Sequence, residues 1–178
     1  MGNTTYTPSF GWPAPAGQSA HPVGFVDWCD AYAYCAWAGK RLCGKIGGGA
    51  TDYLQFANAG ESQWMHACSA GGTRTFPYGD VYDGEACNGS DYPSATPTIE
   101  AGSESACEGG YPGLFDLSGN VREWEDACTG TLGATDPCRI RGGAFDDEEE
   151  SAACDEDYYA GRQIRAGSIG FRCCYDLE

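Results

Sequence analysis

Apolar residues recur at helical spacing in two stretches of the chain. In residues 27–38 they share one helix face, at Trp28, Ala31, Cys35 and Ala38. Asp27 precedes this run and Asp30 follows three residues later, a spacing typical of a capping box. The pattern predicts a buried helix that ends at Gly39. A second, shorter helix is predicted over residues 61–68, where Trp64 and Cys68 are four residues apart.

Two later segments are rich in strand-forming residues, and a long segment before them is rich in turn-forming residues. Residues 139–145 and 169–175 are expected to form adjacent strands in the core. Residues 80–110 are rich in Gly, Ser, Asp and Pro, which predicts a loop. Near the amino end, residues 1–20 are expected to be an irregular arm, and residues 21–176 are expected to form one domain.

The stretch from Gly113 to Trp124 mixes core-forming residues with oxygen donors. Asp116 and Glu123 are seven residues apart, with the turn-forming Ser118-Gly119-Asn120 between them. Such a turn can gather both carboxylates and the intervening carbonyls around a hard cation such as Ca²⁺. The alternative is a plain turn between two core segments whose acids are solvated.

Composition narrows the classes of function. The formal net charge is −16, which repels phosphate backbones and argues against a nucleic-acid partner. Cationic partners and divalent metals stay possible. No apolar run approaches the ~20 residues of a membrane span. The 11 cysteines and 2 histidines favour disulfides over a zinc array, and hence a secreted, extracellular or periplasmic protein. The odd number leaves at least one thiol without an internal partner.

Four blocks of sequence, in order, resemble one family. GLFDLSGNVREW, from Gly113, resembles the GLYDMSGNVWEW signature of the formylglycine-generating enzyme (sulfatase-modifying factor) family. The blocks His21–Leu42, Arg139–Phe145 and Ser168–Cys173 resemble further motifs of the same family. The resemblance implies an α+β fold of the C-type-lectin-like kind, loop-rich, stapled by disulfides and binding structural calcium.

The resemblance also implies a set of metal ligands and disulfides. Asp116 and Glu123 would bind Ca²⁺ through side chains, and Gly119 and Val121 through carbonyls. A first calcium site would involve Asn88 and Asp91, although a solvated loop explains these two equally well. Matching positions imply the disulfides Cys35–Cys173 and Cys68–Cys154. Proximity alone suggests Cys87–Cys107 and Cys128–Cys138, which leaves Cys29, Cys43 and Cys174 unassigned.

The family's oxidase activity depends on two copper-binding cysteines between the RGG and GFRC blocks. Here the one cysteine between Gly143 and Cys173 is Cys154, which matches the structural disulfide. No catalytic residue and no copper are therefore expected. One hypothesis is a binding or structural module whose acidic loop, residues 146–157, contacts a cationic protein or a small ligand. The alternatives are a divergent oxidase or oxygenase that uses an unassigned cysteine, and a disulfide-rich domain without separable activity.

Overall fold

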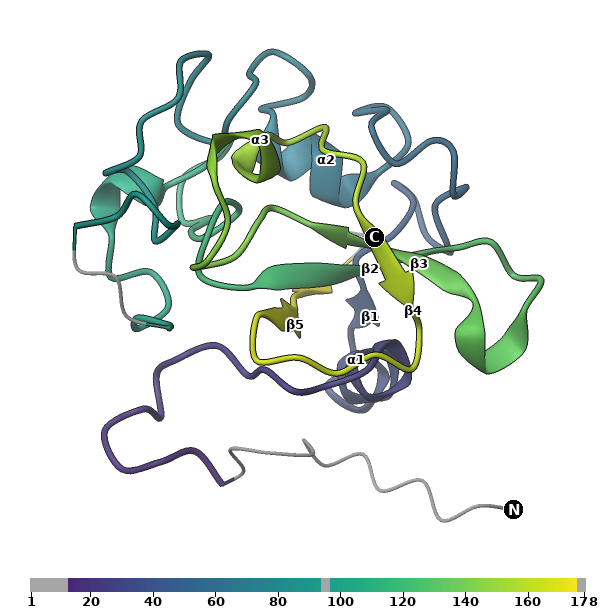
Figure 1. Cartoon of the computed structure of the whole chain (residues 1–178). Helices are drawn as coiled ribbons and strands as arrows, with labels where there is room; N and C mark the ends of the chain where they lie inside the picture. Colours follow the sequence, from purple (N-terminus) through teal and green to yellow (C-terminus); the bar gives the residue numbers. More distant parts are fainter. Residues whose placement is uncertain (1–12, 94–96, 176–178) are drawn as a thin grey trace.

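A computed structural model describes residues 13–93 and 97–175, so residues 1–12 of the predicted amino-terminal arm lie outside this part. A sheet lies at the centre, with α1 (Trp28–Trp37) on one side and α2 (Gln63–Cys68) and α3 (Glu149–Ala152) on the other (Figure 1). The strands are β1 (Arg41–Leu42), β2 (Arg122–Cys128), β3 (Pro137–Arg141), β4 (Tyr159–Gly161), β5 (Ile169–Phe171) and β6 (Cys173–Cys174). Two 3₁₀ turns, Ser105–Cys107 and Gly133–Thr135, complete the regular structure. Loops make up most of the remainder, so the predicted loop-rich α+β class is confirmed.

The main sheet has the order β4-β3-β2-β5, and β1 pairs with β6 in a separate two-stranded sheet. β2 runs antiparallel to β3 and parallel to β5. The expectation that residues 139–145 and 169–175 are adjacent was wrong, because β2 lies between them. Three consecutive residues of β2 are buried, Glu123, Trp124 and Glu125. Burial on both faces is typical of a central strand.

Helix α1 begins where the pattern predicts, after Asp27, and ends one residue earlier than predicted. The Asp27 side chain accepts a hydrogen bond from the backbone N–H of Asp30. The Asp30 side chain accepts one from the backbone N–H of Asp27, which completes the capping box. Gly39 adopts a φ of 70° just after the helix. Ala38 was wrongly assigned to the buried face, because the helix ends at Trp37 and Ala38 is the exposed C-cap.

Helix α2 begins two residues later than predicted, because Ser62 caps it. The Ser62 hydroxyl accepts a hydrogen bond from the backbone N–H of Met65 at 3.0 Å. The core has two clusters. Trp124 packs with residues of α1, and Trp64 packs with residues of α2. The Trp124 indole N–H donates to the carbonyl of Val26 at 3.0 Å, which attaches the segment before α1 to β2.

Five disulfides cross-link the described residues, and three of them join segments more than 80 residues apart. The four predicted pairs, Cys35–Cys173, Cys68–Cys154, Cys87–Cys107 and Cys128–Cys138, are confirmed. The fifth joins Cys43 to Cys174, which the antiparallel pairing of β1 and β6 brings together. Cys29 stays a free, exposed thiol. None of the helices in the described ranges is long and apolar enough to cross a bilayer.

Candidate functional site

The loop that follows β3 starts with two positions that only glycine can occupy. Gly142 and Gly143 have φ values of 89° and 67°. A Cβ at Gly142 would lie 2.5 Å from the carbonyl oxygen of Leu117, and one at Gly143 would lie 2.8 Å from that of Ser151. The chain therefore turns sharply out of β3 at Arg141, four residues before the predicted end of the strand. This turn places residues 144–154 over the end of the sheet, next to α2.

An ion pair between Arg122 and Asp147 anchors this loop to the start of β2. The second carboxylate oxygen of Asp147 accepts from the backbone N–H of Ala144 at 2.7 Å. The Arg122 guanidinium also lies over the ring of Tyr158, 4.1 Å from its centroid. Burial raises the pKa of Asp147, while the neighbouring Arg122 opposes that rise. An ion-paired carboxylate, Asp147, therefore lies in the segment in which the family resemblance places redox-active cysteines.

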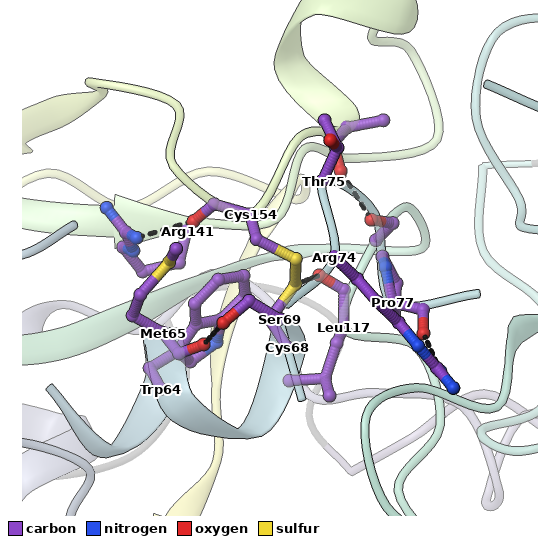
Figure 2. Close-up of a disulfide and its surroundings, with 12 residues drawn as sticks. Trp64, Met65, Cys68, Ser69, Arg74, Thr75, Pro77, Leu117, Arg141 and Cys154 are labelled. Carbon is purple, nitrogen blue, oxygen red and sulfur yellow. Dashed lines mark hydrogen bonds between the residues drawn. A yellow bond between two sulfur atoms is a disulfide. The ribbon is translucent and has the colours of Figure 1, made fainter. Parts of the chain in front are cut away.

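The thiol of Cys154 is consumed in the disulfide to Cys68 (Figure 2). Both cysteines are fully or almost fully buried beside Trp64 and Leu117. The Cys154 backbone N–H donates to the carbonyl of Thr75 at 2.8 Å. Its own carbonyl accepts from the Arg141 guanidinium at 2.7 Å. These contacts hold Cys154 as a structural link between α2 and the loop.

The predicted acidic loop is mostly a solvent-facing surface. Asp147 and Glu156 are half-buried, and the remaining six acids of residues 146–157 are exposed: Asp146, Glu148, Glu149, Glu150, Asp155 and Asp157. Asp157 forms an ion pair with Arg139 although most of its side chain is in water. Such a concentration of exposed carboxylates raises the local density of counter-ions and attracts cationic groups.

The predicted calcium turn is built from left-handed residues. Asp116, Gly119 and Asn120 have φ values of 56°, 73° and 62°. The Asp116 carboxylate accepts from the backbone N–H of Gly102 at 2.8 Å. Burial raises its pKa, although the hydrogen bond from Gly102 and the charge of Arg172 oppose that rise. A cation beside Asp116 would relieve this cost.

Glu123 lies in β2 rather than in the turn, and it already has partners. Its carboxylate receives two hydrogen bonds from the Arg172 guanidinium and one from the Trp64 indole N–H, the last at 2.9 Å. One of its oxygens, Oε1, accepts from Arg172 alone in the described structure. Glu123 could contribute to a cation site only while sharing its charge with Arg172.

Three of the six predicted ligands, Asp116, Val121 and Glu123, line one cavity of about 700 Å³. Asn88 is buried against the turn, where its carbonyl accepts from the Asn120 N–H at 2.8 Å. Its side-chain Oδ1 is buried and accepts no hydrogen bond in the described structure. Asp91 is exposed and accepts instead from the Tyr82 hydroxyl at 3.1 Å. Carboxylate, amide and main-chain oxygens fit a hard cation in kind, more clearly around Asp116 than at Asp91.

A different trio of side chains, Cys128, Asp136 and Cys138, converges within 4.8 Å in the described residues. Two of these three are joined in a disulfide, so they offer no thiolate to a metal.

The sequence did not reveal the basic partners of two carboxylates, Asp147 and Glu123. Arg122 and Arg172 sit inside recognised motifs, so their charges were not matched with Asp147 and Glu123. The composition held one signal for these ion pairs: acidic residues far outnumber the ten lysines and arginines, so carboxylate partners are plentiful. In such a chain a half-buried arginine is expected to have a carboxylate partner.

Comparisons with known proteins agree with this architecture. The family model described as sulfatase-modifying factor enzyme 1-like domain matches residues 3–177. The formylglycine-generating enzyme of Mus musculus is 30% identical over 117 residues, which cover 60% of this chain and 27% of that protein. The protein named inactive C-alpha-formylglycine-generating enzyme 2, also from Mus musculus, is 27% identical over 185 residues, 91% of this chain and 54% of that one. The chain thus spans between about a quarter and about half of the length of these curated relatives.

Two solved structures share the fold. Treponema denticola variable protein 1 superposes with a TM-score of 0.62 at 19% identity, covering 92% of this chain and 74% of that one. The protein CarF superposes with a TM-score of 0.60 at 21% identity, covering 94% and 72% of the two chains.

Proposed function

This chain belongs to the sulfatase-modifying factor enzyme 1-like domain family, and from that premise we propose that it is a binding or structural module without oxidase activity. The main support for this proposal is the disulfide between Cys68 and Cys154. Residues 144–152 contain no cysteine, and Cys154 has no free thiol. A Cu(I) site needs soft thiolate ligands, which carboxylates do not replace.

The Arg122–Asp147 pair supports the same proposal. A guanidinium fixed at the start of β2 places a positive charge next to the loop. This charge would repel a metal cation that approached Asp147. The free thiol Cys29 lies on α1, on the other side of the sheet from α3 (Figure 1). It therefore does not supply a ligand to residues 144–154.

The test is a copper titration with a turnover assay. The oxidised protein is titrated with Cu(I) against a chelator of known affinity, then incubated with oxygen, a reductant and a cysteine-containing sulfatase-type peptide. We expect weak copper binding and no peptide aldehyde. Aldehyde formation would establish the alternative, a divergent formylglycine-generating oxidase or related oxygenase. The family's formylglycine-generating member serves as the positive control.

The binding face that we propose is the exposed acidic loop. The exposed carboxylates of residues 146–157 suit a cationic protein or a small cationic ligand, which the net charge of −16 would also attract. An immobilised oligolysine peptide is a direct probe. We expect salt-sensitive binding that weakens when Glu149 and Glu150 are both changed to Gln.

A matched control removes the same charge elsewhere. Glu85→Gln with Glu100→Gln also removes two exposed carboxylates, at a distance in sequence from the loop. Equal weakening by both double variants would indicate attraction by net charge alone and would contradict a binding face at the loop.

We also propose that Ca²⁺ stabilises the turn at residues 116–123, held by Asp116 and Glu123 with the carbonyls of Gly119 and Val121. The raised pKa of Asp116 and the buried, unpartnered Oδ1 of Asn88 support an added cation near this turn. The five disulfides support a secreted or extracellular location, where calcium is abundant.

A further inference from the structure

The cavity that Asp116 and Glu123 line has mainly apolar walls. It measures about 700 Å³ and is bounded by helix α1, the segment before it, the turn after Gly113 and the end of β5. The apolar side chains around it include those of Val23, Val26, Tyr34, Phe115 and Phe171. The rings of Tyr34 and Phe171 meet edge to face, with their centroids 5.5 Å apart. A cavity of this size and character suits a small organic molecule.

Two of the three carboxylates on the cavity wall already have basic partners. Asp30 forms an ion pair with Arg165 at 2.9 Å. Glu123 accepts two hydrogen bonds from the Arg172 guanidinium, one of them at 2.6 Å. Because both of these charges are balanced within the protein, neither needs a charged ligand.

The third carboxylate, Asp116, forms no ion pair within the described ranges. Its side chain is half-buried, and its Oδ2 accepts from the backbone N–H of Gly102 at 2.8 Å. A carboxylate that is partly withdrawn from water favours a cation beside it. Lys40 also lines the cavity, but it is exposed, so water and salt screen its charge. The wall therefore carries an unbalanced negative charge next to aromatic rings.

We infer that this cavity binds a small organic amine, with its ammonium group on the Asp116 carboxylate and its aromatic body against Tyr34, Phe115 and Phe171. The N–H groups of an ammonium donate charge-assisted hydrogen bonds to a carboxylate. Aromatic side chains pack against a planar ring and attract a cation that lies over their faces. An anion of the same shape is disfavoured by the net charge of −16.

Asp116 is also a ligand in the calcium proposal, and the two cations would compete for it. Amine binding is therefore measured in excess EGTA, and the thermal response to Ca²⁺ is measured separately, without amine. A result against either proposal then leaves the other in place.

The experiment titrates the full chain by calorimetry with three indoles of similar shape. They are tryptamine, which is a cation, tryptophol, which is neutral, and indole-3-propionate, which is an anion. The salt concentration is about 0.15 M, where the attraction of distant charges is screened. We expect tryptamine to bind about tenfold more tightly than tryptophol, because it adds a charge-assisted hydrogen bond. Indole-3-propionate should bind most weakly.

Two variants locate the site. Asp116→Asn removes the charge but keeps an oxygen for the Gly102 N–H, and Asn tolerates the φ of 56° at this position. It should lower the affinity for tryptamine to that for tryptophol. Tyr34→Ser should weaken both several-fold. Tyr32→Ser is the matched control, because Tyr32 also lies in α1 and is 45% exposed, against 52% for Tyr34, but does not line the cavity. It should bind both ligands like the wild type.

Several results would overturn the inference. One is the absence of binding at millimolar tryptamine, and another is tryptamine binding that survives Asp116→Asn undiminished. Tighter binding of indole-3-propionate than of tryptamine would indicate an anion site instead. Propylamine has the charge without the ring, so equal affinity for propylamine and tryptamine would indicate attraction by net charge alone and would also contradict the proposed site.

Discussion

Arg122, the first residue of β2, forms an ion pair with Asp147 in the loop that follows β3. Each side chain is less than a fifth exposed. Asp147 also accepts from the Ala144 N–H, so one carboxylate fixes both the loop and its distance from the sheet. The pair therefore determines where the acidic surface sits.

Replacing Asp147 with Ala should loosen this loop. The change leaves the half-buried Arg122 and the Ala144 N–H without their acceptor, which costs about 1–3 kcal/mol. We expect a melting temperature lower by about 3–10 °C and faster proteolysis within residues 144–154. Asp146→Ala is the control, because Asp146 is exposed. Equal effects of the two changes would contradict an anchoring role for the pair.

Removal of the Cys68–Cys154 disulfide should be severe. The link spans 86 residues, and a loop of that length stabilises the folded state by about 3–5 kcal/mol. We expect the double variant Cys68→Ser, Cys154→Ser to unfold at a markedly lower denaturant concentration. Cys29→Ser should leave the unfolding midpoint of the monomer unchanged. A double variant as stable as the wild type would show that packing around Trp64 suffices.

Chelation tests the calcium proposal. Excess EGTA should lower the melting temperature of the wild type, because a ligand bound only to the folded state stabilises it. Asp116→Ala should lower the starting value and remove the response to EGTA. Asp116 is preferable to Glu123 for this test, since Glu123 also binds Arg172 and Trp64. A wild type that melts identically with and without EGTA would refute the proposal.

The ionised carboxylate of Asp126 in β2 should lower the stability of the folded protein, and the pH dependence of unfolding should show this. Burial raises the pKa of Asp126 above its ordinary value, although Arg41 and Arg162 oppose the rise. A carboxyl with a raised folded-state pKa favours folding below its unfolded pKa, and that contribution is lost as pH rises through the folded pKa. Asp126→Asn should therefore raise the melting temperature at pH 7 and have little effect below about pH 4. A constant difference across this range would rule out the titration of Asp126 as its cause.

Local sequence signals predicted the elements that short-range physics determines. The capping box at Asp27 and Asp30 and the glycine at position 39 located α1 because each acts within a few residues. The family motifs predicted the general fold and two disulfides, Cys35–Cys173 and Cys68–Cys154. Proximity in the sequence predicted the other two, Cys87–Cys107 and Cys128–Cys138.

Long-range relations were less accessible. The sequence of β3 and β5 predicts two strands, but not that β2 lies between them, because strand order depends on tertiary packing. The same limit hid the Arg172–Glu123 pair, which joins residues 49 apart. The Cys43–Cys174 link follows from a two-residue strand pairing too short to produce a pattern.

The two neighbouring cysteines of β6 have a consequence for biosynthesis. Cys173 and Cys174 bind partners that precede them by 138 and 131 residues. Neither cross-link can close until residues 173 and 174 have left the ribosome, long after α1 has been made. Helix α1 is therefore cross-linked only after β6 has been made, and a polypeptide that stops before Cys173 would carry neither bond.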